Sequence, residues 1–426
     1  MKFYPPPKRV MTLLGFGTAI SLLGDATLYT VLPYPSIASQ VGVSLAMVGV
    51  LLGANRATRL VMNGPVGLLY EKLPRRPLLV ASLVLGTVSS IFYAIGSGFW
   101  PLFSGRVLWG IAWSLLWIGG NTVVLDISTD ENRGRHSGQY QRWFFLGVAL
   151  SSFLGGMFTD LFGFRVGQWL SATLIGGAAL LWFFFLPETR PADRHERHTQ
   201  PGKIPQGSFP WRIVMRVSLP IFVARFVSWG VLAATSILWL SSLIGEGLRL
   251  SNHLIPIATL TGAYTALRMI TSIGSASAAG FLSDRSGYRW PIISVAMLVG
   301  GIGIWLMSMK LLTLALVGAF LSPVIDGSIE TLVPAIAGDR IDKVLQGRAL
   351  GLIYTIADLG GTLGPPIVLG VLGVEWLPLD VVYKGSAILF VFVVLFALVQ
   401  ARGEPPNRGC DKITGRMANH DRHHRF

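Results

Sequence analysis

Cysteine is nearly absent from this sequence, which contains only Cys410, close to its C-terminal end. A lone cysteine excludes a disulfide within the chain. The same tail carries His420, His423 and His424 without cysteine or carboxylate ligands at the spacing of a metal site, so we expect no bound metal. Because a phosphate-binding loop and a nucleophile elbow are also missing, the sequence does not indicate an enzyme or a cofactor.

Charged residues are scarce as well. They make up 13% of the chain, against about 25% in an average soluble protein, whereas hydrophobic residues make up 52%. A helix needs about 20 apolar residues to cross the hydrocarbon of a membrane, and backbone groups in lipid must be paired within the helix. Twelve such runs fit, centred near residues 21, 54, 87, 112, 148, 176, 229, 266, 299, 324, 359 and 390. The sequence therefore predicts an all-α membrane protein with twelve transmembrane helices.

The basic residues outnumber the acidic ones and give a net charge of +14, which could suggest a nucleic-acid partner. Their distribution argues against one, because they gather in alternate loops. Lys72, Arg75 and Arg76 follow the second run, and Arg285 and Arg289 follow the eighth. This asymmetry predicts that both termini lie in the cytoplasm, and it explains the charge without nucleic acid.

The order of the runs predicts two bundles of six helices. Residues 1–189 form the first bundle and residues 217–401 the second, joined by a linker over 190–216 that is rich in Pro, Arg and His. We interpret the linker as a solvated cytoplasmic loop, with a regulatory site as the alternative. The basic tail, 402–426, is predicted to be disordered.

A shift by half the chain length aligns the two bundles. It places Gly67 on Gly280, Gly134 on Gly347 and Gly147 on Gly360. This agreement indicates a duplicated chain with two pseudo-symmetric halves.

The second copy of the repeated loop reads Gly280-Phe-Leu-Ser-Asp284-Arg285-Ser-Gly287-Tyr-Arg289. Gly280 is expected to let two helices approach closely and Gly287 to permit a tight turn. The stretch resembles the G-x-x-x-D-R-x-G-R-R/K motif of the major facilitator superfamily, which lies between helices two and three and is often echoed between helices eight and nine. In the first copy, Glu71 replaces the Asp of the motif, Lys72 its Arg and Pro74 its Gly.

This resemblance implies a substrate site near the midplane between the bundles, reached by alternating access. In that family helices 1, 4, 7 and 10 line the cavity, and helices 2, 5, 8 and 11 flank it. The two motif loops would form a conformational gate, made of Gly67, Glu71, Arg75 and Arg76 in the first loop and of Gly280, Asp284, Arg285, Gly287 and Arg289 in the second.

Ionisable residues inside membrane helices are costly and are therefore functional candidates. Asp25 in helix one and Arg106 in helix four lie about 12 and 9 Å below the outer face, so we expect them to pair. Arg106 and Gly110 also resemble the family's R-x-x-x-G motif, which is associated with proton coupling, and an acid beside that arginine is similar to multidrug:proton antiporters. A permanent structural ion pair is the alternative.

Helix ten carries Asp326 and Glu330 on one face. Depth along the helices suggests that Arg268 pairs with Asp326, which would leave Glu330 as the freer, more readily protonated acid. All three could instead form a buried network without a transport role.

Arg59 in helix two and Asp358 in helix eleven lie about 12 and 15 Å from the cytoplasmic face. In the family these helices meet across the two halves. We expect a salt bridge that forms when the cytoplasmic side closes and breaks when water enters.

Trp113, Trp117 and Asn121 repeat at helical spacing in helix four, and with Trp229 they suggest an aromatic-lined cavity. Such a wall suits amphipathic or cationic ligands, although packing between helices explains it equally well. Arg225 in helix seven and Arg268 would favour an anionic substrate instead.

Together these features predict a secondary transporter of the cytoplasmic (inner) membrane that moves a small organic solute, acts as a monomer in the lipid bilayer and couples to protons. Export is the preferred direction, as in drug:proton antiporters, although Ser151-Ser152 stands where their helix-five signature has Gly-Pro. The alternatives are proton-coupled uptake of a metabolite or organic anion and, more remotely, a receptor or sensor without flux.

Overall fold

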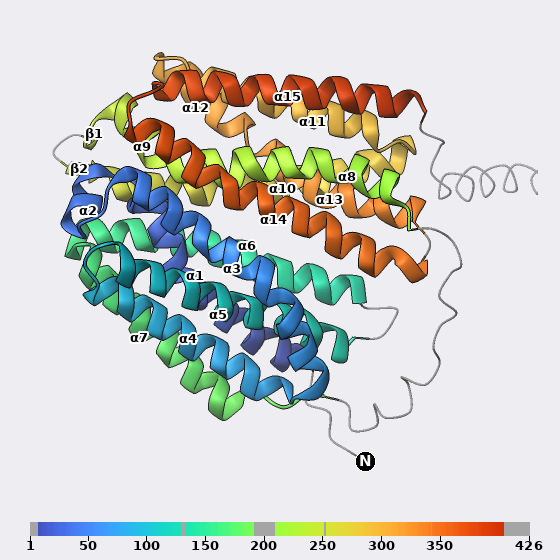
Figure 1. Ribbon diagram of the computed structural model, residues 1–426, viewed down its shortest axis with the longest axis horizontal. Helices are drawn as coiled ribbons and strands as arrows, with labels where there is room; N and C mark the ends of the chain where they lie inside the picture. Colours follow the sequence, from blue (N-terminus) through green and yellow to red (C-terminus); the bar gives the residue numbers. More distant parts are fainter. Residues whose placement is uncertain (1–6, 129–132, 191–208, 251–252, 342, 404–426) are drawn as a thin grey trace, which may run out of the picture. The chain divides into compact units, whose positions relative to one another are not determined.

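A computed structural model of the chain describes residues 7–128, 133–190, 209–250, 253–341 and 343–403 (Figure 1). The elements up to residue 185 are α1 (Pro7–Val31), α2 (Pro35–Gln40), α3 (Leu45–Lys72), α4 (Arg75–Ile95), α5 (Phe99–Asp126), α6 (Arg133–Phe162) and α7 (Phe164–Phe185). The later ones are α8 (Trp211–Ala224), the π-helix η1 (Arg225–Leu232), α9 (Ala233–Ile244), β1 (Gly247–Leu250), β2 (His253–Pro256), α10 (Ile257–Ser286), α11 (Trp290–Met307), α12 (Leu312–Leu321), α13 (Val324–Arg340), α14 (Lys343–Gly373) and α15 (Leu379–Arg402).

The twelve predicted apolar runs are helical, and the tenth is divided by a turn at Ser322-Pro323 into α12 and α13. Within the described residues, eleven helical segments are long and apolar enough to cross a membrane. The remaining run corresponds to α10, which has 30 residues and so is long enough. Its Ser and Thr side chains and Arg268 lower its mean hydropathy, which is why composition alone does not select it.

The structure divides into two compact units. Unit 1 comprises Met1–Pro201, Trp229–Ile270 and Gly361–Leu377, and unit 2 comprises Gly202–Ser228, Thr271–Gly360 and Pro378–Phe426. The division passes through η1, α10 and α14, so unit 1 holds the first six membrane helices together with segments of three later ones. The predicted division of the chain into halves joined at 190–216 stays a prediction.

Large aromatic side chains packed against small residues form the core of unit 1. α1 packs against α6, and α4 lies between α5 and α7 (Figure 1). Trp182 of α7 is fully buried against Gly17 of α1, and its indole nitrogen donates to the Leu13 carbonyl at 2.7 Å. The glycines of α1 let these rings lie against its backbone, as is common where membrane helices meet.

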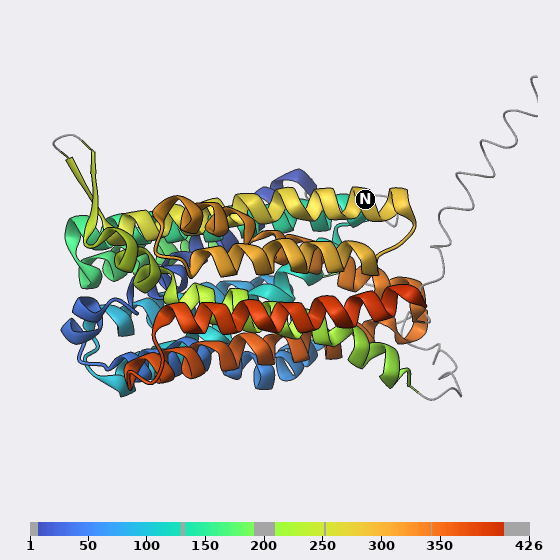
Figure 2. The ribbon, with the colours of Figure 1, turned by 90° about the horizontal axis from the view of Figure 1, so that it is seen from above.

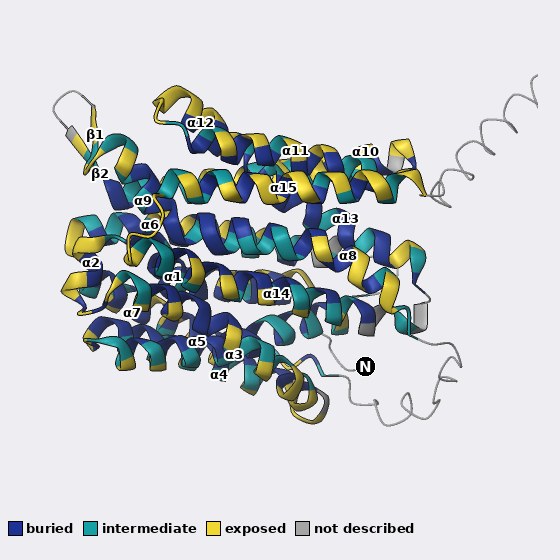
Figure 3. Ribbon diagram, turned by 45° about the horizontal axis from the view of Figure 1, so that its top comes forward, coloured by how far each residue is buried: buried dark blue, intermediate teal, exposed yellow. Residues whose placement is uncertain are grey.

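In unit 2, α11 packs against α12 and α15, and α13 packs against α8. Large apolar residues cover the outer faces of α12 and α15, where Figure 3 shows long exposed stretches. Leu316, Phe320 and Phe392 are each about half exposed or more. Such faces are stable in lipid, which agrees with the predicted membrane location.

A short hairpin interrupts the helices in unit 1. Strands β1 and β2 pair antiparallel after the end of α9 and project from it (Figure 2). The Ile257 amide donates to the Glu246 carbonyl at 3.0 Å, which ties the start of α10 to the base of the hairpin. The sequence analysis did not predict this hairpin.

Candidate functional site

The structure brings Asp25 of α1 and Arg106 of α5 into an ion pair inside unit 1. Asn55 of α3 donates to the same carboxylate oxygen of Asp25 at 3.0 Å. The Arg106 guanidinium is fully buried, donates to the Leu51 carbonyl at 2.9 Å and lies 5.4 Å from the centre of the Tyr29 ring. Arg106 therefore has three kinds of partner: an acid, a carbonyl and an aromatic face.

Asp25 differs from its partner in exposure, because its side chain is 16% exposed whereas that of Arg106 is 0% exposed. A carboxylate that remains partly accessible can exchange a proton, while a guanidinium keeps its charge. The geometry thus places a partly exposed acid beside a fully buried cation. Whether Asp25 couples protons to transport stays a prediction.

Arg56 of α3 forms a second polar centre in unit 1, and the sequence analysis missed it. Its guanidinium donates to the carbonyls of Trp229 at 2.9 Å and Gly361 at 2.7 Å, and it lies over the Tyr29 and Trp229 rings at 5.4 and 5.9 Å. Arg56 is buried. One side chain therefore joins α3 to η1 and to α14.

Further contacts in unit 1 tie α6 to α10. The Thr259 amide and hydroxyl both donate to one carboxylate oxygen of Asp160, each at 2.6 Å. An acid there accepts a free donor at the start of α10 and interacts favourably with the helix dipole. A Cβ added to Gly262 of α10 would meet backbone atoms of Ser152 and Phe153, so only glycine allows this approach.

These contacts lie toward one side of unit 1, which we call the distal side. It is the side on which α1 ends, α3 begins and α6 ends. Gly53 of α3 also packs there against α14, because a Cβ on it would lie 2.7 Å from the Thr362 carbonyl oxygen. Arg56, Asp160 and two close glycine contacts thus hold segments of η1, α10 and α14 against the first six membrane helices.

The predicted aromatic wall exists but packs largely against itself. Trp113 and Trp117 stack with centroids 5.5 Å apart, and Trp117 also contacts Tyr140 at 5.6 Å and Phe144 at 5.1 Å, both from α6. Trp229 packs against the same cluster. Trp113 is buried and Trp117 half-buried, so Trp117 is the more accessible to a ligand. A substrate role for these residues stays a prediction.

Asn121, one turn beyond Trp117, donates from its side-chain amide to the Trp117 carbonyl at 2.7 Å. This hydrogen bond lies within α5, so in the structure the amide nitrogen of Asn121 is bonded to the backbone of its own helix. The predicted role of Asn121 in the cavity stays open.

In unit 2, Arg225 of η1 pairs with Glu330 of α13 at 2.6 Å. Asp326 and Asp358 are also close enough to Arg225 to act on it electrostatically. Glu330 was expected to be the freer acid of helix ten, but its carboxylate is paired with Arg225. This pairing was missed because Arg225 was considered only as a substrate ligand. That Glu330 is the more readily protonated acid stays a prediction.

Two other predicted pairs stay predictions. Arg268 lies in unit 1 and Asp326 in unit 2, and Arg59 and Asp358 are divided in the same way. Arg268 is buried and lies 5.9 Å from the centre of the Tyr264 ring within unit 1.

The first motif loop is organised by acids that the sequence analysis did not single out. Arg75 is buried and pairs with Asp126 at 3.0 Å. Glu188, which follows α7, accepts from the Arg75 and Arg76 amides at 2.9 and 3.0 Å and so binds the start of α4. The stretch Leu186-Pro-Glu188-Thr was predicted only as the end of a helix. In the structure its Glu188 also holds the first motif loop in place.

The second motif loop is held by Arg289, which pairs with Asp339 of α13 at 2.6 Å. Gly287 has φ +75°, as its predicted turn requires. Gly280 does not mark a close approach of helices, which corrects the prediction, because a Cβ there would only reach Thr331 at an ordinary 3.5 Å. Gly67 likewise has no described atom within 4 Å of such a Cβ, and Arg285 is exposed.

The side chains of Glu71 and Asp284 lie outside the described part of the structure. Their predicted contribution to the gate stays a prediction.

The sequence model described as Major Facilitator Superfamily matches residues 14–365, and a second match covers 257–416. The chain belongs to the major facilitator superfamily. It is a transporter by family and fold, with many apolar helices that cross a membrane, and the predicted fold class is confirmed.

Two relatives of this facilitator are resistance or efflux proteins. It is similar to the class C tetracycline resistance protein of Escherichia coli, with 25% identity over 371 residues, which cover 83% of this chain and 85% of that protein. It is also similar to a chloramphenicol efflux pump of Mycobacterium tuberculosis (strain ATCC 25618 / H37Rv), with 32% identity over 144 residues, 34% of each chain.

Solved structures confirm the fold of this facilitator. A bacterial homolog of the human lysosomal transporter Spinster, in an inward-facing and occupied conformation, matches with a TM-score of 0.71 and 15% identity over 94% of this chain and 96% of that chain. The human organic anion transporter MFSD10 (TETRAN) matches with a TM-score of 0.64 and 17% identity, covering 92% of this chain and all of that one.

Proposed function

We propose that this facilitator exports a small amphipathic organic compound across the cytoplasmic membrane in exchange for protons. The observation that carries the proposal is the Asp25–Arg106 pair. It combines a partly exposed acid with a fully buried cation in α1 and α5, two of the helices expected to line the cavity. The tetracycline and chloramphenicol relatives support the direction of transport.

The chemistry of the pair suggests how coupling would work. When Asp25 is ionised it neutralises Arg106, with Asn55 sharing the carboxylate. When Asp25 takes up a proton, the buried guanidinium loses its counter-charge in a poorly solvated site, which favours states that admit water. Proton binding and the arrangement of α1, α3 and α5 would therefore depend on one another.

Arg225 and Glu330 support an alternative, which is proton-coupled uptake of an organic anion. Protonation of Glu330 would release the Arg225 guanidinium, which could then bind a carboxylate or phosphate. In the present arrangement the Glu330 carboxylate is paired with that guanidinium at 2.6 Å and takes the place that an anionic substrate would need. We therefore favour a cationic or neutral substrate.

Alternating access also requires the distal side to open. With the termini in the cytoplasm, as the charge distribution predicts, the distal side faces outward. The Arg56 bonds to Trp229 and Gly361 and the Asp160 bonds to Thr259 would then close the outward side and break when substrate leaves.

The test is proton release from purified, detergent-solubilised protein on addition of cationic, neutral and anionic lipophilic compounds. We expect release with cationic or neutral compounds in the wild type and its loss in Asp25→Asn. The matched control is Asp380→Asn, which makes the same change in a partly exposed pair with Lys384 at one end of α15. It should release protons normally.

Three outcomes would count against the proposal. Unchanged release in Asp25→Asn would remove Asp25 as the coupling acid. Release by anions alone, lost in Glu330→Gln, would favour the uptake alternative. Binding without flux in proteoliposomes that carry a proton gradient would indicate the remote alternative, a receptor or sensor.

A further inference from the structure

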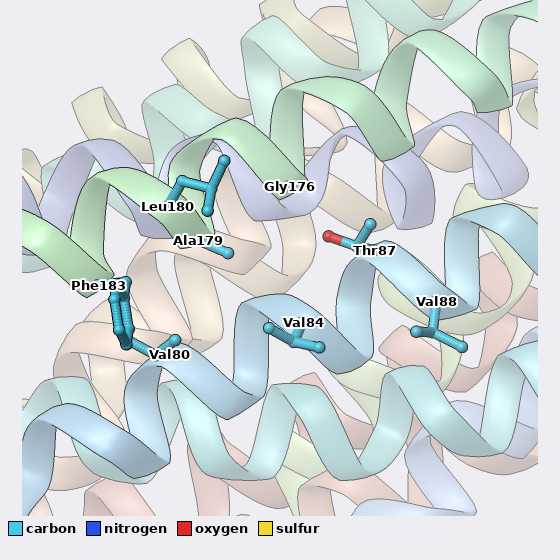
Figure 4. A pocket seen from close by; sticks show the side chains of 8 residues that line it. All are labelled: Val80, Val84, Thr87, Val88, Gly176, Ala179, Leu180 and Phe183. Carbon is cyan, nitrogen blue, oxygen red and sulfur yellow. The ribbon is translucent and has the colours of Figure 1, made fainter.

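A groove with an almost purely carbon lining lies between α4 and α7 of unit 1, within the membrane-spanning part. Its volume is about 360 Å³. Val80, Val84 and Val88 of α4 and Gly176, Leu180 and Phe183 of α7 line it (Figure 4). The one polar side chain, Thr87, donates its hydroxyl to the Leu83 carbonyl at 2.9 Å, so its hydrogen is already bonded within α4.

The groove opens toward the surroundings and not toward the core. Val84, Leu180 and Phe183 are 48%, 61% and 52% exposed. Its floor is open at Gly176, where an added Cβ would reach only Thr87, at an ordinary 3.5 Å. In a helix that crosses hydrocarbon, such a depression is covered by lipid chains.

One end of the groove carries a cluster of cations. The Arg76 guanidinium lies 5.8 Å from the centre of the Phe183 ring and donates to the Phe183 carbonyl. Arg190 donates to the Lys72 carbonyl at 2.7 Å, which places it at the same end, where α3 finishes, and Lys72 is exposed.

Glu188 is an acid beside these three cations, and its carboxylate accepts from several backbone amides, including those of Arg76 and Arg190, at 3.0 and 2.9 Å. It therefore binds the loop backbone, and among the side chains that the structure describes here the three cations outnumber it.

We propose that this groove binds one acyl chain of an anionic phospholipid, whose phosphate lies at Arg76 between Lys72 and Arg190. Val80 lies one helical turn beyond Arg76, and Val88 lies about 12 Å further along α4. A chain that starts below the headgroup can thus run along the whole groove. Basic residues at the membrane surface select anionic headgroups, and the predicted topology places this end at the cytoplasmic leaflet.

The proposal is tested with the full-length purified protein and two lipids that have identical acyl chains, phosphatidylglycerol and phosphatidylcholine. Lipid retention is measured by native mass spectrometry and affinity by the lipid-dependent shift in thermal unfolding. Unfolding without added lipid is recorded for every variant, which separates lost binding from lost folding. We expect phosphatidylglycerol to bind at least about tenfold more tightly, because each basic residue contributes roughly fivefold.

Two pairs of variants separate chain from headgroup. Gly176→Leu fills the groove, whereas Gly177→Leu makes the same change at the next, exposed position, where an added Cβ meets nothing within 4 Å. We expect Gly176→Leu alone to lower retention of both lipids. Arg76→Gln should lower phosphatidylglycerol affinity about fivefold and leave phosphatidylcholine unchanged, while Arg142→Gln, an exposed cation on α6, should change neither.

The proposal is overturned if the two lipids bind equally to the wild type, or if Gly176→Leu and Gly177→Leu behave alike. It is also overturned if inorganic phosphate alone produces the whole thermal shift, since the acyl chain would then contribute nothing.

Discussion

Replacing Arg56 by alanine should open the distal side of this facilitator. Arg56 donates to the Trp229 and Gly361 carbonyls at 2.9 and 2.7 Å, and its guanidinium lies 5.4 Å from the centre of the Tyr29 ring. Alanine removes both hydrogen bonds and leaves two carbonyls without this donor. The segments of η1 and α14 that Arg56 joins to α3 would then separate more readily.

The size of the effect follows from the number of bonds. A hydrogen bond from a charged donor contributes about 1.5–3 kcal/mol, so two such bonds give about 3 kcal/mol at the low end of the range. A loss of about 3 kcal/mol changes an equilibrium about 150-fold. If the closed arrangement outweighs the open one by about 99 to 1, the variant would be open for more than half of the time.

Cysteine accessibility measures this shift, and the chain is well suited to it because Cys410 is its single cysteine. In a Cys410→Ser background, Ser152→Cys places a thiol at a buried position of α6 beside Gly262. We expect Arg56→Ala to speed labelling by an impermeant thiol reagent, added from outside, about fiftyfold. Arg142→Ala, the removal of an exposed cation from α6, should leave the rate unchanged. Equal labelling of the wild type and a folded Arg56→Ala protein would refute the reasoning.

Two further predictions concern other contacts. Arg59→Ala and Asp358→Ala should each favour the inward-open state, because the predicted salt bridge closes the cytoplasmic side. Thiol labelling from the cytoplasmic face should therefore rise in both variants. Unchanged labelling in both would contradict the predicted salt bridge. Gly110→Ala should destabilise the fold by about 1–3 kcal/mol, because its Cβ would lie 2.7 Å from the Asn55 carbonyl oxygen, whereas Gly177→Ala meets no such atom. Thermal unfolding of the two alanine variants compares them, and equal midpoints would count against close packing at Gly110.

The parts of the site that the sequence revealed are those made by two ionisable side chains. Asp25 and Arg106 are both charged residues in apolar runs, and counting residues along helices placed them at similar depth. The partners of Arg56 are backbone carbonyls, which carry no sequence signature. Nothing in the sequence therefore marked Arg56 as the residue that joins α3 to η1 and α14 within unit 1.

The unpredicted partner of Glu330 has a different cause. Counting depth says how far a residue lies along a helix but not which way its side chain points. A twelve-helix fold could be predicted from composition and the repeated loop, but a count along the helices could not select Arg225 of η1 as the partner of Glu330.

The two polar centres of unit 1 differ in their chemistry, and this difference explains how protons could act on the distal side. The hydrogen bonds from Arg56 to the Trp229 and Gly361 carbonyls do not depend on the protonation of an acid, whereas the Asp25–Arg106 pair loses its negative partner when Asp25 is protonated. Tyr29 connects the two centres, because the Arg56 and Arg106 guanidiniums each lie 5.4 Å from the centre of its ring.

With Asp25 ionised, its carboxylate neutralises the Arg106 guanidinium. Protonation would remove that negative charge from beside the half-buried Tyr29 ring, over which both guanidiniums lie, and like charges repel strongly where the dielectric constant is low. Water screens that repulsion, so on the proposed mechanism protonation of Asp25 would favour arrangements in which water reaches Arg56. Such arrangements would weaken the bonds from Arg56 to η1 and α14, so a proton on α1 would change the closure of the distal side through Tyr29 and Arg56.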